Sequence, residues 1–278
     1  MGWAKYGEDI VSRWVGDNYM QSRPARRGQP RSAAASAAGA TRKSRAKAGS
    51  GTAPKEKSMS ELSEFTMSSA RPLPVIVLAD VSGSMAANGK IDVLNEAVRE
   101  MIATFAEEED TRAEIHVAVV TFGADGARLH KPLKPASEVT WESMSASGRT
   151  PMGGAFTLVQ QLVEDREAIP GRAYRPTIVL VSDGVPTDDW KTPLASLLGS
   201  DRAAKAARFA MGIGDDADKE TLRAFLVGDE GRVFEAHEAR EIRKFFRWVT
   251  MSVTSRSRSA NPNNVVAVEP TALDDFEF

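Results

Sequence analysis

The segment Leu73-Pro-Val-Ile-Val-Leu-Ala-Asp-Val-Ser-Gly-Ser84 decides the fold expected for this chain. Its first half is a nearly continuous run of branched apolar residues, which is typical of a central strand covered on both faces. Asp80 ends this run, and two serines follow at every second position before a stretch that favours a helix. The segment therefore predicts a buried strand with a polar loop at its carboxyl end.

Strands and amphipathic helices continue to alternate downstream. Further strands are expected at Ile115–Phe122, Thr177–Val181, Arg208–Ile213 and Val233–Glu235. Helices are expected at Ile91–Glu107, Met152–Asp165, Ala195–Ala207, Lys219–Leu226 and Ala239–Val253. This alternation predicts an α/β fold, Rossmann-like and doubly wound, with a mostly parallel sheet and helices on both faces. A short strand around Ala127–Leu133 is expected at an antiparallel edge, because its prolines disfavour a central position.

Composition divides the 278 residues into four parts. Residues 1–20 carry apolar side chains at helical spacing, among them Trp3 and Trp14, and predict an amphipathic helix that docks on its own domain or on a partner protein. Residues 21–70 are basic and poor in large apolar side chains, which predicts a disordered linker. Residues 71–255 are expected to form the α/β domain, and residues 256–278 a flexible acidic tail.

Several classes of protein are excluded or disfavoured by what the sequence lacks. It has no cysteine, so disulfide frameworks, zinc ribbons and thiol catalysis are ruled out. No apolar run approaches the roughly 20 residues that span a bilayer, and no signal-peptide pattern is present. We therefore expect a cytoplasmic protein without a membrane partner.

The loop after the first strand carries a pattern of oxygen donors. Asp80, Ser82 and Ser84 offer one carboxylate and two hydroxyls, and Gly83 permits the loop to curl so that they converge. Ligands bind at this carboxyl edge in open α/β sheets. Because no histidine or cysteine belongs to the group, it selects a hard cation, magnesium first and manganese or calcium next.

Two further polar loops are expected at the same edge of the sheet. Ser147-Gly-Arg-Thr-Pro-Met-Gly-Gly154 offers Thr150 where a helix begins. Asp183 ends another buried strand within Leu180-Val-Ser-Asp-Gly-Val-Pro-Thr-Asp-Asp-Trp190. In chain order and strand context, the three loops resemble the metal-ion-dependent adhesion site of von Willebrand factor A domains.

The resemblance extends from Arg71 to roughly Val253, and within the family the loops are most similar to TerY-type proteins of bacterial tellurite-resistance and stress loci. It implies a VWA fold in which Ser82, Ser84 and Thr150 touch the metal directly. Asp80 and Asp183 would act through bound waters or hydrogen bonds to the serines. The context it implies is a bacterial stress-response or defence system, with a kinase, phosphatase or ATPase of the same locus as partner.

Neutral hydroxyl ligands would leave the cation much of its charge, and magnesium readily keeps an exchangeable position. An Asp or Glu of a partner protein would fill it, so we expect a non-enzymatic binding or scaffold module. Arg149, where many family members have a small residue, would add a donor to that carboxylate. Asp188, Asp189 and Trp190 are either contacts at the rim of the site or a turn and a helix start.

Other interpretations stay open. The five metal-site residues are also good turn formers and helix caps. The basic residues of 21–57 would bind nucleic-acid phosphates, although a solvated tether is the simpler interpretation. The acidic tail, with Asp274, Asp275 and Glu277, would drive self-assembly if it filled the metal site of a neighbouring molecule. An enzyme is disfavoured, because no Gly-x-Ser-x-Gly surrounds the serines and no histidine lies in the loops.

Overall fold

The computed structural model describes residues 70–108, 112–124, 126–226 and 233–264 of the chain. The expected N-terminal helix with Trp3 and Trp14, the linker up to residue 69 and the tail from residue 265 lie outside these ranges. Within the ranges, no helix is both long enough and apolar enough to cross a membrane.

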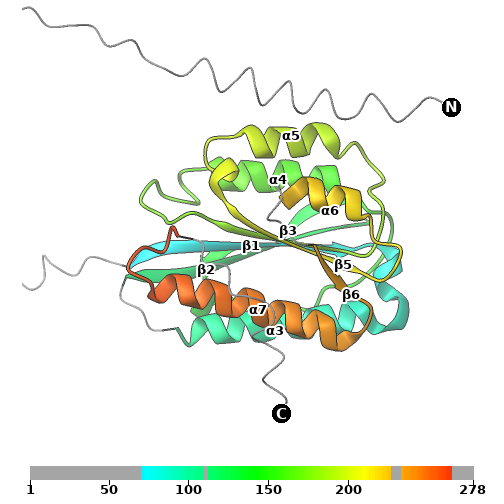
Figure 1. Cartoon of the computed structure of the whole chain (residues 1–278), viewed down its shortest axis with the longest axis horizontal. Helices are drawn as coiled ribbons and strands as arrows, with labels where there is room; N and C mark the ends of the chain where they lie inside the picture. The colour runs from blue at the N-terminus through cyan, green and yellow to red at the C-terminus, as the bar shows by residue number, and fades with distance from the viewer. Residues whose placement is uncertain (1–69, 109–111, 125, 227–232, 265–278) are drawn as a thin grey trace, which may run out of the picture. The chain divides into compact units, whose positions relative to one another are not determined.

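A six-stranded sheet forms the centre of the domain, in the order β3-β2-β1-β4-β5-β6 (Figure 1). Its strands are β1 (Arg71–Val81), β2 (Ala113–Gly123), β3 (Gly126–Pro135), β4 (Thr177–Ser182), β5 (Ala207–Ile213) and β6 (Phe234–Ala236). The β2–β3 pair is antiparallel, and the other four pairs are parallel. The expected mostly parallel sheet with one antiparallel edge strand is therefore confirmed.

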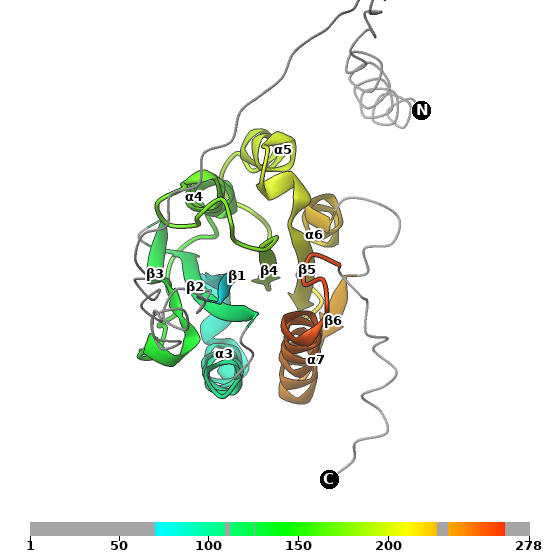
Figure 2. The ribbon, with the colours of Figure 1, turned by 90° about the vertical axis from the view of Figure 1, so that its left-hand side faces the viewer.

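Helices cover both faces of the sheet (Figure 2). One face carries α3 (Lys90–Ala106) and α7 (Ala239–Arg258), and the other carries α4 (Met152–Glu164), α5 (Lys191–Gly199) and α6 (Lys219–Leu226). Side chains alternate along β1, so Val75 and Val77 pack in the cluster with α3 and α7, whereas Ile76 and Leu78 join the cluster with α4, α5 and α6. Burial on two faces explains why the apolar run of β1 is nearly continuous.

Helix α5 differs from its prediction, because it begins at Lys191 and ends at Gly199 instead of spanning Ala195–Ala207. The Asp189 carboxylate accepts the backbone N–H groups of Lys191 and Thr192, at 3.1 and 3.4 Å, and so starts the helix early. Ala207, expected at the end of this helix, is instead the first residue of β5. The alanines and leucines of this segment form no pattern that marks where α5 ends and β5 begins.

Helix α7 also differs, because it continues past the expected Val253 to Arg258. Residues 256–258, expected in the acidic tail, therefore belong to the helix. The reason is Arg256, whose side chain is buried and hydrogen-bonded to the chain around the start of β4. Burial, together with the nearby charge of Arg175, lowers the pKa of this guanidinium to about 10.

Candidate metal centre

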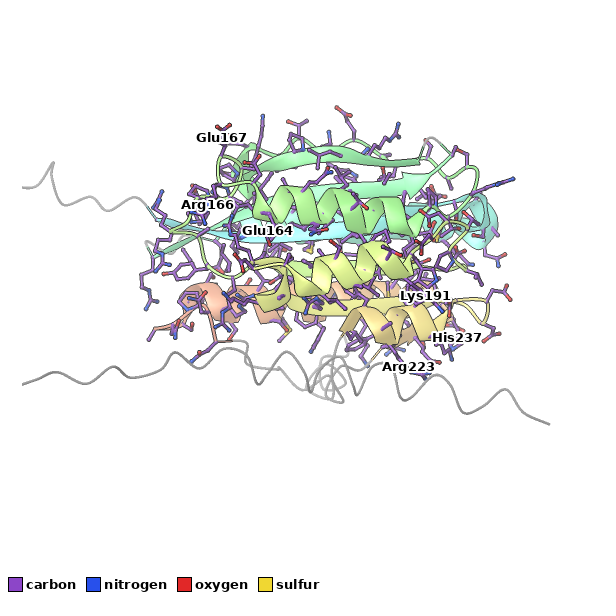
Figure 3. All side chains as sticks on the ribbon, turned by 90° about the horizontal axis from the view of Figure 1, so that it is seen from above. Glu164, Arg166, Glu167, Lys191, Arg223 and His237 are labelled. Atoms are coloured by element: carbon purple, nitrogen blue, oxygen red, sulfur yellow. The ribbon has the colours of Figure 1, made fainter. Side chains whose placement is uncertain are left out.

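The three polar loops lie at the carboxyl edge of the parallel strands. The first follows β1 and leads into the short helical segment η1 (Gly83–Gly89), the second precedes α4, and the third follows β4. Figure 3 marks the two ends of the sheet: Lys191 and His237, which follow β4 and β6, lie at this edge, whereas Glu164, Arg166 and Glu167 lie at the opposite one. Segments about 100 residues apart in the sequence thus meet at one place, as expected for parallel strands.

Asp80 lies at the bottom of this edge with no exposed surface. Its Oδ1 accepts the backbone N–H of Ser82 at 2.8 Å, and its Oδ2 accepts the hydroxyl of Ser182 at 2.5 Å. Burial raises the pKa of the Asp80 carboxyl, whereas the hydrogen bonds from Ser182 and Ser82 oppose that rise. All these donors are neutral groups, so a negative charge on Asp80 is stabilised by dipoles alone.

A chain of hydrogen bonds joins the first loop to the third. The hydroxyls of Ser82 and Ser84 lie 3.1 Å apart, and that of Ser84 donates to Oδ1 of Asp183 at 2.7 Å. The Nζ of Lys90 donates to the other oxygen, Oδ2, also at 2.7 Å. Ser84 is exposed, whereas Ser82 and Asp183 are buried, so the group opens to solvent at Ser84.

Thr150 brings the second loop to the same point. A Cβ placed on Gly184 would lie 3.5 Å from the Thr150 hydroxyl and 3.9 Å from the Ser84 hydroxyl, so both oxygens face the same small volume. The backbone of Thr150 is fixed by Thr187, which donates its N–H to the Thr150 carbonyl at 2.9 Å and accepts the Thr150 N–H at 3.2 Å. The structure therefore brings together all five residues that the sequence named.

The backbone between the first two loops is crowded, and glycine is required there. Gly83 donates its N–H to the carbonyl of Gly148 at 3.0 Å, and Ser147 donates to the carbonyl of Val81 at 2.7 Å. Gly148 adopts a φ of +74°, and a Cβ on it would lie 2.4 Å from the Cα of Ala124. The two hydrogen bonds hold the loop that carries Thr150 against the loop that carries the serines, and the missing side chain of Gly148 lets this loop pass close to the end of β2.

The predicted rim residues have structural roles in the third loop. Asp188 accepts the backbone N–H groups of Gly153 and Gly154, at 3.0 and 2.9 Å, and thereby caps the start of α4. Asp189 starts α5, and hydrogen bonds from Thr192 lower the pKa of its carboxyl. Trp190 is partly buried against the core of that face. Contact of these residues with a partner stays a prediction, as it does for the exposed Arg149.

We expect Asp188→Ala to lower the free energy of unfolding by about 1 kcal/mol, because two backbone N–H groups at the start of α4 lose their acceptor. Urea unfolding of the isolated protein measures this. Asp188→Asn keeps one of the two acceptor oxygens and should therefore lose less stability than Asp188→Ala. Equal stability of wild type and Asp188→Ala would show that the two hydrogen bonds do not hold the helix start.

Three residues of the centre were not predicted, namely Ser182, Lys90 and Thr187. Ser182 directly precedes Asp183 at the end of β4, and this adjacency is a signal that sequence reasoning could have used. Lys90 is the first residue of α3, and Thr187 lies in the turn after β4; neither contact follows from sequence spacing. Both become visible only when the loops are placed in three dimensions.

The donor chemistry of the centre fits a hard divalent cation. Its side chains are two carboxylates and three hydroxyls, all oxygen donors of the kind that magnesium, manganese and calcium accept. Among the described residues, no group of three or more His, Cys, Asp or Glu side chains has a metal-binding arrangement. A soft-metal site is thus not found in this part of the chain, and any cation here would depend on the hydroxyls.

A groove lies elsewhere on the domain. It has a volume of about 790 Å³ and runs between α3 and α7, with Ala97, Met101 and Phe246 among its lining residues. None of the five metal-site residues lines it. The candidate metal centre, at the carboxyl edge of the sheet, is therefore separate from this groove.

Comparisons with known proteins agree with the fold. The family model described as "von Willebrand factor type A domain" matches residues 75–185. Among solved structures, the proximal thread matrix protein 1 from the mussel byssus is 18% identical with a TM-score of 0.53, covering 67% of this chain and 49% of its own. A structure of the same mussel protein with a zinc-occupied MIDAS motif is 17% identical with a TM-score of 0.51, covering 67% of this chain and 48% of its own.

A bacterial surface protein shows the same likeness. The pilus adhesin SpaC from Lactobacillus rhamnosus GG, in its open conformation, is 14% identical with a TM-score of 0.53, covering 66% of this chain and 30% of its own. This chain thus spans half or less of the length of these structures, and at such identities the likeness concerns the fold. A search of curated proteins found no significant match. Residues 75–185 thus match the von Willebrand factor type A domain model, and the solved structures show the same fold.

Proposed function

We propose that this domain is a divalent-cation-dependent protein-binding module. Ser82, Ser84 and Thr150 would hold Mg²⁺ directly, and the ion would offer a free position to an Asp or Glu of a partner protein. Asp80 and Asp183 would stabilise the ion through waters or through the serines. Arg149, exposed beside Thr150, would donate a second hydrogen bond to the captured carboxylate.

One observation carries the proposal: two buried carboxylates and three hydroxyls from three separate loops lie near one another. Asp80 and Asp183 have 0% and 1% exposed surface. Buried charges are costly unless they are paired, and Lys90 pairs with Asp183 only. A cation above the hydroxyls would compensate the remaining charge. The zinc-occupied MIDAS motif of the mussel protein supports this assignment by analogy of fold.

We also propose that the site binds and does not catalyse. The serine hydroxyls interact with each other and with Asp183, and not with a base that would activate them as nucleophiles. The three histidines of the chain have partners elsewhere: Glu114 for His116, the Glu142 carbonyl for His130 and Asp215 for His237. Among the described residues, no histidine therefore serves the metal loops.

The finer predictions rest on the resemblance to TerY-type proteins. We propose on that ground that the partner belongs to a bacterial stress-response or defence system, as a kinase, phosphatase or ATPase, and that the protein acts in the cytoplasm. Binding of nucleic acid by residues 21–57 and self-assembly through the acidic tail concern residues outside the described ranges, and both stay predictions.

The test is metal affinity, measured by isothermal titration with Mn²⁺ as the probe. We expect Thr150→Ala to weaken binding by tenfold or more, on the order of 1.4 kcal/mol or greater, because a direct ligand is lost. Thr104→Ala is the matched control, since the Thr104 hydroxyl is exposed on α3 and, within the described part of the chain, bonds only to the Glu100 carbonyl. A wild-type protein that binds no Mn²⁺, or a Thr150→Ala variant that binds it equally well, would defeat the proposal.

Partner capture gives the second readout. Affinity purification with Mg²⁺ should retain a protein that is lost with chelator and lost with Thr150→Ala, while Thr104→Ala retains it. Capture that survives both the chelator and Thr150→Ala would show that the interaction does not use the metal.

A further inference from the structure

Lys90 places a fixed positive charge inside the metal centre. Its Nζ lies 2.7 Å from Oδ2 of Asp183, whose side chain has no exposed surface, while that of Lys90 is 20% exposed. The other oxygen of Asp183 accepts the Ser84 hydroxyl at 2.7 Å. The ammonium is thus linked through one carboxylate to a hydroxyl that faces the proposed cation.

The backbone before α3 is built to bring Lys90 to this position. Asn88 and Gly89 adopt left-handed conformations, with φ of 56° and 68°, and the helix begins at the next residue. Asn88 is the only non-glycine residue with positive φ in the described part of the chain. The Lys90 Nζ also lies 3.6 Å from where a Cβ on Gly214 would stand, so the ammonium fits between the loops after β4 and β5.

We propose that Lys90 is a built-in counter-cation that weakens binding of the metal alone and couples tight metal binding to capture of an acidic partner. The proposal rests on the proposed function, because it concerns the regulation of the same site. Lys90 acts on the metal through Asp183 and through its charge, so it is a positioning residue and not a metal ligand.

The direction of the effect follows from the charges. Two carboxylates, one ammonium and one divalent cation give the loaded site one net positive charge. The ammonium leaves the empty site one net negative charge instead of two and so weakens its attraction for the metal. The net positive charge of the loaded site attracts a carboxylate, and the carboxylate of a partner brings the total to zero. Without Lys90 the loaded site is already neutral. The metal alone then binds more tightly, and the bound metal attracts the carboxylate of a partner less strongly. Like charges a few ångströms apart in a partly buried site carry enough energy to shift affinity about tenfold or more.

A merely structural ion pair would behave differently. If Lys90 only supported the loop, its removal would loosen the centre and weaken metal binding. If it acts as a counter-cation, removal of its charge strengthens metal binding, whereas Lys90→Arg, which keeps the charge, leaves affinity near the wild-type value. The two roles of Lys90 therefore predict opposite changes in metal affinity for Lys90→Gln.

The experiment titrates Mn²⁺ into wild type, Lys90→Gln, Lys90→Arg and Lys219→Gln. Lys219 is the matched control, because it also pairs with a carboxylate at 2.7 Å, that of Glu235, outside the three loops. We expect Lys90→Gln to bind Mn²⁺ about tenfold more tightly and both other variants to stay within about twofold of wild type. Acetate added as a carboxylate probe should tighten Mn²⁺ binding to wild type more than to Lys90→Gln.

The outcomes separate this inference from the proposed function. Lys90→Gln that binds Mn²⁺ no more tightly than wild type, while Thr150→Ala still loses it, overturns the role of Lys90 and leaves the metal site standing. No Mn²⁺ binding by either wild type or Lys90→Gln overturns both. Thermal unfolding guards against a folding defect: Mn²⁺ should raise the melting temperature of Lys90→Gln more than that of wild type, and an equal or smaller rise counts against the inference.

Discussion

Replacing Arg256 by alanine is expected to lower the free energy of unfolding by about 3 kcal/mol. Arg256 donates hydrogen bonds to the Pro262 carbonyl at 3.0 Å, the Thr177 hydroxyl at 2.6 Å and the Arg175 carbonyl at 2.9 Å. These bonds join the last turn of α7 to the start of β4 and to the segment after the helix. Truncation leaves buried acceptors without a donor and opens a cavity among packed groups.

Part of this loss in the free energy of unfolding is offset, because burial of the charged Arg256 guanidinium itself destabilises the folded state. The fall of its pKa to about 10 has burial as its main cause. The neighbouring Arg258 provides the comparison, since its own side chain is 66% exposed, while that of its partner Glu108 is 10% exposed. Arg258→Ala should lower the free energy of unfolding less than Arg256→Ala, because an exposed guanidinium leaves no cavity. Urea unfolding measures both variants, and equal losses would contradict the role assigned to Arg256.

Gly148→Ala is expected to lower the free energy of unfolding by about 3 kcal/mol or more and to abolish tight metal binding. The new Cβ would meet a φ of +74° and would lie 2.4 Å from the Cα of Ala124, which is backbone and cannot rotate away. The second loop must then move, and the Gly148 carbonyl that accepts the Gly83 N–H moves with it. Thr150 would separate from the serines.

Gly126→Ala separates the two causes of this effect. Gly126 also has a positive φ, +87°, but among the described residues no heavy atom lies within 4 Å of its added Cβ. Gly126→Ala should lower the free energy of unfolding by only about 1–2 kcal/mol, because alanine disfavours this backbone conformation. It should leave Mn²⁺ affinity unchanged. Thermal unfolding and Mn²⁺ titration of both variants measure this. Equal effects at the two glycines would show that crowding against Ala124 does not hold the site.

The parts of the fold that depend on apolar patterning could be predicted from the sequence. The run at Val75–Leu78 indicated a strand buried on two faces, and its alternating side chains do enter two different clusters. Pro132 and Pro135 indicated that the strand expected around Ala127–Leu133 lies at an edge, and the structure places β3 there. Where burial of apolar residues decides an element, local sequence is informative.

Elements decided by single polar contacts could not be predicted in this way. The start of α5 depends on a carboxylate, that of Asp189, and the end of α7 on Arg256, which looks like a surface residue in its serine- and arginine-rich context. Both contacts give no periodic signal. Helix boundaries are for this reason the least predictable part of the fold.

The residues of the candidate metal centre show the same difference in predictability. Five of its residues follow from the loop motifs, from the rule that parallel strands share a carboxyl edge, and from the resemblance to von Willebrand factor A domains. Ser182 and Lys90 complete the hydrogen bonding of Asp80 and Asp183 across 102 and 93 residues of sequence. Such long-range partners depend on the path of each loop, which only the three-dimensional structure provides.

A crystal structure with Mn²⁺, read by anomalous scattering, tests the central claim most directly. We expect one manganese peak bonded to the hydroxyl oxygens of Ser82, Ser84 and Thr150, at roughly 2.0–2.3 Å, with water or a carboxylate at a remaining position. Ordered crystals grown with Mn²⁺ that show no peak among these three hydroxyls, or a peak only at other groups, would contradict the account.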